Sequence, residues 1–161
     1  MLKRIKSNVF RAGEARFAII ASRYNGRYVD SMLTAAKAEL RGAGVREMQV
    51  VRVPGAFEIP VVAARLARVS NERSAVACII CLGVILRGQT THAAHIAEAV
   101  TRALAEIQIK YEVPVIHEVL LLENEEQARV RCLGREHNRG REAAQTALEM
   151  ARVMGKVRSL G

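Results

Sequence analysis

The feature that most constrains the fold of this chain is an alternation of a strand-like apolar run with a helical segment, repeated four times. The strand-like runs are Arg16 to Ser22, Met48 to Val53, Ala75 to Leu86 and Val113 to Leu122. The first shows little polar alternation, which is typical of a strand buried on both faces. Strands that alternate with helices join in parallel through right-handed crossovers. The sequence therefore predicts an α/β fold, a three-layer α-β-α sandwich with a central four-stranded parallel sheet.

The helical segments between these runs are marked by apolar spacing and by capping residues. In the first, Asp30 or Ser31 is expected to cap the helix, and Gly42 with Gly44 to end it. Its apolar face consists of Met32, Leu33, Ala36 and Leu40. Helical spacing returns over Ala56 to Val69, from Thr91 onward, over Asn124 to Arg131 and, after an interruption at Gly134 to Gly140, over Glu142 to Val153. We expect a flavodoxin-like architecture or a close relative of it.

Length and composition fit one α/β domain. A chain of 161 residues can close a single core, and 50% of its residues are hydrophobic, with no Trp. No apolar run reaches the roughly 18 residues of a membrane helix, and Met1 to Phe17 lacks the apolar centre of a signal peptide. We therefore expect a cytoplasmic protein with no membrane partner.

The cysteines and histidines do not form a recognisable metal or disulfide pattern. The three cysteines have no framework spacing, as expected for a reducing compartment. Cys78 and Cys81 lie three apart on a strand and should face opposite sides of the sheet, so packing is favoured over a redox or zinc pair. His92 and His95 are three apart on a helix but have no third ligand near them in sequence. No metal is predicted.

The formal net charge of +9 raises the question of nucleic-acid binding. The basic residues are scattered, however, and no aromatic side chains are interleaved with them for base stacking. The densest cluster, Arg135, Arg139 and Arg141, has Glu136 and Glu142 beside it. We expect no nucleic-acid partner, since anionic substrates or the electrostatics of assembly explain the charge more simply.

A strand-to-helix turn at Gly83 to His92 is the strongest candidate for a binding site. At such a turn the first backbone N–H groups of the helix have no internal partner and favour an anion. Gly88 permits close approach, and Gln89, Thr90 and Thr91 add side-chain donors. His92 follows directly and can transfer a proton near neutral pH. The turn therefore suggests a phosphorylated substrate, although a plain capped helix with a surface histidine would also explain it.

Two further residues have both a structural and a functional interpretation. Glu58 follows Pro54-Gly55 in the first turn of a helix, where the dipole stabilises a carboxylate and where it could also accept substrate hydroxyls. Arg131 ends a helix, where a cation is favoured, and its fork of donors also suits a phosphate. In parallel sheets the ligand crevice lies outside the carboxyl ends of the strands, where these loops fall.

Four motifs in the same order and spacing make the sequence closely resemble the 6,7-dimethyl-8-ribityllumazine synthase family. They are Val53-Pro-Gly-Ala-Phe-Glu-Ile-Pro60, Gly83-Val-Ile-Leu-Arg-Gly-Gln-Thr-Thr-His92, Glu125-Glu-Gln-Ala128 and His137-Asn-Arg-Gly140 followed by Glu142-Ala-Ala. The resemblance runs from about Ala15 to Met154. It implies a single domain over residues 1–161, with a core at 15–154 and an N-terminal extension at 1–14.

The resemblance implies an activity and an assembly. The family joins 5-amino-6-(D-ribitylamino)uracil to 3,4-dihydroxy-2-butanone 4-phosphate in the penultimate step of riboflavin biosynthesis, with loss of phosphate and two waters and with no metal or organic cofactor. Its common unit is a homopentamer, and some members form sixty-subunit shells. Riboflavin synthase is the expected pathway partner.

Site residues follow from the resemblance position by position. Those matching the pyrimidine and ribityl subsite are Tyr24, Asn25, Ala56, Phe57, Glu58, Val84, Ile85, Leu86, His117 and Arg139, with residues 84–86 binding the uracil through their backbone. Gln89, Thr90 and Arg131 match the phosphate site, and His92 matches the proton-transfer histidine. In the family, a ring neighbour supplies the residues matching His117 and Arg131, so a site shared between subunits is expected.

Three positions depart from the family pattern. Tyr24 stands where Phe is usual, and its ring can stack equally. His117 replaces an aromatic, usually Phe, and a titratable ring there would make binding depend on pH. Arg139 replaces a lysine, so any proton-donating role of that lysine is in doubt. A flavin- or nucleotide-binding module without activity, and a basic assembly or nucleic-acid protein, are the competing hypotheses.

Overall fold

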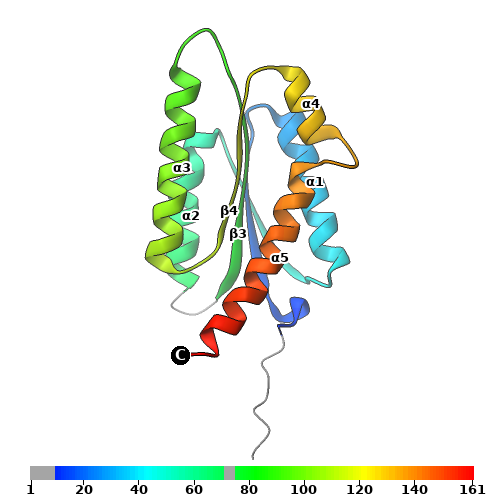
Figure 1. The fold of residues 1–161 in the computed structure, drawn as a ribbon, viewed down its shortest axis with the longest axis vertical. Helices are drawn as coiled ribbons and strands as arrows, with labels where there is room; N and C mark the ends of the chain where they lie inside the picture. The colour runs from blue at the N-terminus through cyan, green and yellow to red at the C-terminus, as the bar shows by residue number, and fades with distance from the viewer. Residues whose placement is uncertain (1–9, 71–74) are drawn as a thin grey trace, which may run out of the picture.

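The computed structural model describes residues 10–70 and 75–161 and has three layers. Figure 1 shows the sheet edge-on, with α2 (Ile59–Ser70) and α3 (His92–Tyr111) on one side. The other side carries α1 (Gly26–Gly42), α4 (Glu125–Leu133) and α5 (Arg139–Arg158). The predicted sandwich is confirmed. Residues 1–9 of the predicted extension at 1–14 lie outside the described residues, and its described part includes a short 3-10 turn at Ala12–Glu14.

The sheet is entirely parallel and has the strand order β2-β1-β3-β4. Its strands are β1 (Arg16–Ser22), β2 (Glu47–Val53), β3 (Val76–Leu86) and β4 (Val115–Leu122). All four predicted strands are present, with starts within two residues of those expected. β1 and β3 occupy the centre and are buried almost throughout, as a parallel strand covered on both faces should be.

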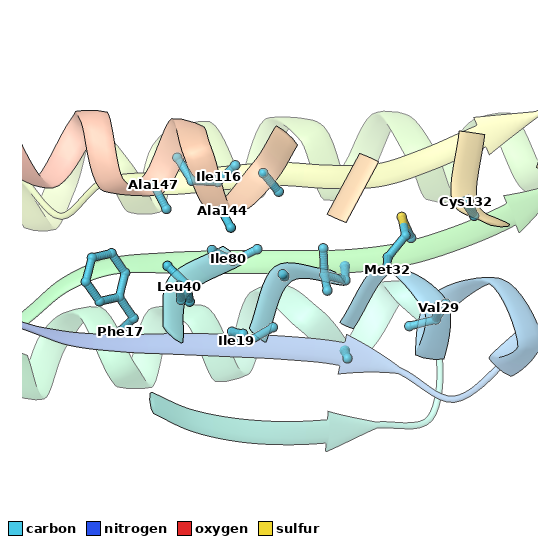
Figure 2. Packing of buried hydrophobic residues seen from close by; sticks show 14 of the residues in the cluster. Phe17, Ile19, Val29, Met32, Leu40, Ile80, Ile116, Cys132, Ala144 and Ala147 are labelled. Carbon is cyan, nitrogen blue, oxygen red and sulfur yellow. The ribbon is translucent and has the colours of Figure 1, made fainter. Parts of the chain in front are cut away.

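Alternate residues of the central strands contribute their side chains to two separate cores, one on each face of the sheet. The core beneath α1, α4 and α5 contains Phe17, Ile19 and Ile80, and Figure 2 shows their side chains beside those of α1 and α5. Cys78 belongs to this core and Cys81 to the one beneath α2 and α3. The two sulfurs thus face opposite sides, as predicted, and burial raises the pKa of both thiols above the ordinary value.

The predicted start of α1 is wrong. The helix begins at Gly26, because Asn25 adopts a left-handed conformation (φ 56°) and its carbonyl accepts from the N–H groups of Tyr28 and Val29. Asp30 and Ser31 therefore lie inside the helix rather than at its cap. Their side chains bind elsewhere, Asp30 to the Arg52 guanidinium at 2.7 Å and Ser31 to the Cys132 carbonyl at 2.7 Å.

Two other helix starts also differ from the sequence prediction. The segment expected to be helical from Ala56 opens with a 3-10 turn, Ala56–Glu58, and α2 proper begins at Ile59. The last helix begins at Arg139 rather than Glu142, since the Asn138 side chain accepts from the Gly140 N–H at 2.9 Å and caps it. Among the described helices, none has the length and apolar character of a membrane span.

Candidate active site at the carboxyl edge of the sheet

A pocket of about 570 Å³ opens at the carboxyl ends of β1 and β3. The strand order reverses between these two strands, which is where ligands bind in doubly wound sheets. Its lining comes from the segments that follow β1 and β2, from the end of β3 and from the start of α3: Tyr24, Asn25, Gly55, Ala56, Phe57, Glu58, Val84, Ile85, Leu86, His92 and Ile96. Nine of these residues were predicted to form the site from the sequence; only Gly55 and Ile96 were not.

The loop after β1 is held against its neighbours by main-chain and side-chain bonds. The Tyr24 N–H donates to the Pro54 carbonyl at 3.0 Å, and the Asn25 side-chain amide donates to the Val84 carbonyl at 2.7 Å. Asn25 therefore connects the ends of two strands through the same left-handed turn that starts α1. One lone pair of the Val84 carbonyl is thereby used within the protein. Residues 84–86 pair with β4 along one edge, whereas β1 pairs with β3 only as far as Leu82, which leaves the other edge of 84–86 without a strand partner in the described sheet.

The Glu58 side chain has a structural role in the loop after β2. One carboxylate oxygen of Glu58 accepts from the Gly55 N–H at 2.8 Å and so closes the turn before α2. A Cβ at residue 55 would lie 2.9 Å from both that oxygen and the Tyr24 ring, so a larger residue there would displace the Glu58 or Tyr24 side chain. The carboxylate is nevertheless exposed and lines the pocket, where its remaining lone pairs can accept from a ligand.

Two large aromatic side chains stand at the pocket with most of their surface uncovered. Tyr24 is 68% exposed and Phe57 is 61% exposed. Burying aromatics of this size contributes strongly to stability, so their exposure at a pocket indicates that something else covers them. A flat heterocycle, a neighbouring subunit, or both together would do so.

The start of α3 has the properties of an anion site. Residues 87–92 are exposed, and the helix has no side-chain cap at Thr91. The His92 N–H has a single long contact of 3.4 Å to the Thr90 hydroxyl, so the first turn retains donors that point out of the helix end. Gln89 and Thr90 precede it directly but are not among the pocket-lining residues, whereas His92 is.

The three remaining predicted residues do not join this pocket. Arg131 lies in the last turn of α4 and Arg139 at the start of α5, both on the opposite layer. His117 lies on β4, on the α3 side, where its Nε2 is 2.7 Å from the Thr101 hydroxyl. Within the described chain, the pocket is therefore built without the predicted phosphate-binding arginine.

Arg139 is engaged in a cluster that the sequence analysis missed. Its Nε and Nη2 lie 3.2 and 3.3 Å from the two carboxylate oxygens of Glu118, and its Nη1 lies 2.7 Å from Glu142. Glu118 is only 8% exposed, and burial raises its pKa although Arg139 opposes the shift. The neighbouring Cys132 thiol has its pKa raised to about 11, first by burial and then by the Glu118 charge. The sequence feature that could have revealed this cluster is Glu118, a glutamate inside an apolar strand.

The sequence of the chain matches a known family over nearly its whole described length. A model of the family "6,7-dimethyl-8-ribityllumazine synthase" matches residues 14–155. The chain belongs to the 6,7-dimethyl-8-ribityllumazine synthase family. The matched range includes every residue of the pocket, so the resemblance noted in four motifs is confirmed for the domain as a whole.

Curated relatives agree with the family match. The Stenotrophomonas maltophilia (strain R551-3) protein named 6,7-dimethyl-8-ribityllumazine synthase is 42% identical to this chain, over 87% of this chain and 89% of that protein. The proteins of the same name from Xanthomonas campestris pv. campestris (strain B100) and Xanthomonas oryzae pv. oryzae (strain PXO99A) are 43% and 44% identical, each over 87% of this chain and 90% of the relative. The chain thus spans almost the full length of these enzymes.

Proposed function

We propose that this protein condenses 5-amino-6-(D-ribitylamino)uracil with 3,4-dihydroxy-2-butanone 4-phosphate to 6,7-dimethyl-8-ribityllumazine. The observation that carries the proposal is a single pocket that combines a backbone edge, two exposed aromatics and a histidine at an uncapped helix start. The backbone edge and the aromatic rings suit the heterocycle and polyol of one substrate. The uncapped helix start suits the phosphate ester of the other. In riboflavin biosynthesis, riboflavin synthase would take the product onward.

The pyrimidine would occupy the side of the pocket formed by Tyr24 and the ends of β1 and β3. Backbone groups of residues 84–86 can pair with the polar edge of a uracil, while the Tyr24 ring covers its face. Ala56, Phe57 and Glu58 follow along the adjacent loop, where the Glu58 carboxylate can accept from ribityl hydroxyls. This places the reactive amine toward the start of α3.

The phosphate would lie at the first turn of α3, with Gln89 and Thr90 as side-chain donors. In the reaction the amine attacks the ketone, the carbinolamine loses water, phosphate is eliminated and the ring closes. Every step moves a proton, and His92 is the pocket residue able to transfer one near neutral pH. Holding two substrates in contact supplies much of the remaining rate.

The family is oligomeric, and we propose a homopentamer in which each site is completed by the neighbouring subunit. The support lies in what the pocket lacks. Arg131 and His117 are outside it within one chain, and Tyr24 and Phe57 remain uncovered. A heterologous ring contact would bring the two sets together. A sixty-subunit shell would be a further assembly of the same rings. The buried thiols fit a reducing cytoplasm, which we propose as the location.

The direct test is to incubate the purified protein with both substrates and to follow lumazine absorbance and fluorescence. We expect turnover without added metal and in the presence of a chelator, since the described residues contain no group of three or more His, Cys, Asp or Glu side chains placed to hold a metal. Binding of a flavin without turnover would instead support the binding-module hypothesis. Activity abolished by the chelator would contradict the metal-independent reaction.

His92→Ala is expected to slow turnover by about tenfold or more while substrate dissociation constants change little, because a general acid/base contributes to the rate rather than to binding. The comparison is kcat for wild type and variant, with substrate affinity measured separately. His95→Ala is the matched control, since His95 is exposed one turn further along α3 and does not line the pocket. Equal kcat for wild type and His92→Ala would leave His92 as a surface residue at a helix start.

A further inference from the structure

The His117 ring is held at both nitrogens by partners from two elements. Its Nε2 lies 2.7 Å from the Thr101 hydroxyl on α3, and its Nδ1 accepts from the Val119 N–H at 3.1 Å. β4 is an edge strand of the described sheet, and the N–H groups of Val115 on the strand and of Glu123 just after it also donate to side chains. The ring therefore closes part of an open sheet edge as well as reaching the helix.

These two contacts favour one position of the ring proton. A backbone N–H can only donate, so Nδ1 must carry a lone pair. A neutral ring then carries its proton on Nε2 and donates it to the Thr101 oxygen, whereas a cationic ring would direct a second N–H at that of Val119. The geometry thus accommodates one tautomer of the neutral imidazole and disfavours the cation.

The surroundings of the ring also favour the neutral form. Burial lowers the pKa of His117 below its ordinary value, and a hydrogen bond to its own backbone opposes that shift only in part. On α3, Glu98 and Arg102 flank Thr101 and pair with each other at 2.9 Å. On β3, the residue in register is the buried Cys81, whose raised thiol pKa keeps it neutral. Glu118 and its partner Arg139 lie on the other face of β4.

We propose that Thr101 is a positioning residue that holds His117 as the neutral Nε2–H tautomer in one fixed orientation, ready to contact the pyrimidine substrate of the neighbouring subunit. The contact with substrate rests on the proposed function; the tautomer and its fixation do not. Substrate binding is then expected to depend little on pH near neutrality, in contrast to the pH dependence expected from the sequence. Because the pKa of His117 is lowered, half of the rings are protonated only at a pH below the ordinary histidine pKa of about 6.5, and protonation would break the Val119 contact.

The first measurement is the protonation state of the ring in the assembled protein. Protein with nitrogen-15 in its histidine side chains would be studied by solid-state NMR at about pH 7.5, well above the ordinary histidine pKa. The signal of His117 among the four histidines is assigned by its loss in His117→Phe. We expect an unprotonated Nδ1 and a protonated Nε2 in the wild type. A protonated Nδ1, or an average of the two tautomers, would overturn the proposal.

The second measurement is the Michaelis constant for the pyrimidine in Thr101→Val, which keeps the shape of the side chain but removes its acceptor. We expect that constant to rise about three- to tenfold, as loss of one hydrogen bond would predict, with kcat little changed. Thr101→Ser restores the hydroxyl and should return it to within about twofold of wild type. In a His117→Phe background, Thr101→Val should have no effect, since the ring no longer donates.

The outcomes separate this inference from the proposed function. A wild-type protein that makes no lumazine refutes the function, and the NMR result then stands alone as the test of the tautomer. An active protein whose Thr101→Val variant keeps the wild-type Michaelis constant refutes the positioning role. An equal effect of Thr101→Val in the wild-type and His117→Phe backgrounds would also refute it, because Thr101 would then act through the fold and not through the histidine.

Discussion

Gly140→Ala is expected to destabilise the protein by about 3 kcal/mol or more, a large part of the roughly 5–15 kcal/mol that holds a domain folded. α5 crosses α1 at this glycine, and an added Cβ would overlap the Met32 backbone, with the Met32 Cα only 2.6 Å away. Both sides of the contact are main chain. No side-chain rotamer can relieve the overlap, so the two helices would have to separate and open the core between them.

The measurement is the free energy of unfolding from urea titration, or the loss of soluble protein if the variant does not fold. Gly155→Ala is the control in the same helix, because nothing lies within 4 Å of a Cβ built there. In a helix, alanine is favoured over glycine by up to about 1 kcal/mol, so the control should be neutral or stabilising. A Gly140→Ala variant as stable as Gly155→Ala would mean that the close crossing of α1 and α5 is absent in solution.

The His137-to-Gly140 motif has a structural role at this crossing of α1 and α5. The Asn138 amide donates to the Cys132 carbonyl at 2.6 Å and to the Ser31 hydroxyl at 3.3 Å, while its oxygen caps α5. One side chain thus joins α1, α4 and α5, next to the arginine that begins α5. In the sequence the motif signalled only the family. Its physical role, to fix three helices around Gly140, depends on contacts between segments about a hundred residues apart.

The central strands β1 and β3 were predictable because burial on two faces leaves a continuous apolar run, whereas the largely exposed β2 was recognised from its β-favouring residues. The same rule placed Cys78 and Cys81 on opposite faces, since the alternation of a strand does not depend on what packs against it. Helix starts were less predictable. At Asn25 a single left-handed residue starts α1 at Gly26, and its side chain donates to the Val84 carbonyl instead of capping the helix. Asp30 and Ser31 looked like caps but serve tertiary contacts.

The pocket was largely predictable and the pairs around it were not. Loops that follow parallel strands meet at one edge, so Tyr24, Glu58 and His92 could be grouped from their order in the chain. The pairing of His117 with Thr101, or of Glu118 with Arg139, joins a strand to a helix across the fold. Periodicity assigns each of these residues to a face but says nothing about which partner is opposite.

The site shared between subunits leads to the second large prediction. Glu58→Ala and Arg131→Ala are each expected to be nearly inactive, since one removes a pocket carboxylate and the other the cation that one chain alone does not bring to the pocket. When the two variants are unfolded together in equal amounts and refolded, mixed rings should recover roughly a quarter of wild-type activity. A working site needs an intact Glu58 half from one subunit and an intact Arg131 half from its neighbour, and random mixing satisfies each condition half of the time.

The control mixture combines Glu58→Ala with His92→Ala, whose lesions lie in the same pocket. Neither variant has an intact half that carries both Glu58 and His92, so no arrangement in a ring creates a complete site and activity should stay at the average of the two parents. Glu58→Gln, which keeps an acceptor for the Gly55 N–H, separates loss of the turn from loss of the charge. If the Glu58 and Arg131 variants fold and mix yet recover no more than this control, both halves of the site lie within one chain. The ring model would then be wrong, and Arg131 would have to reach the pocket by a rearrangement of α4.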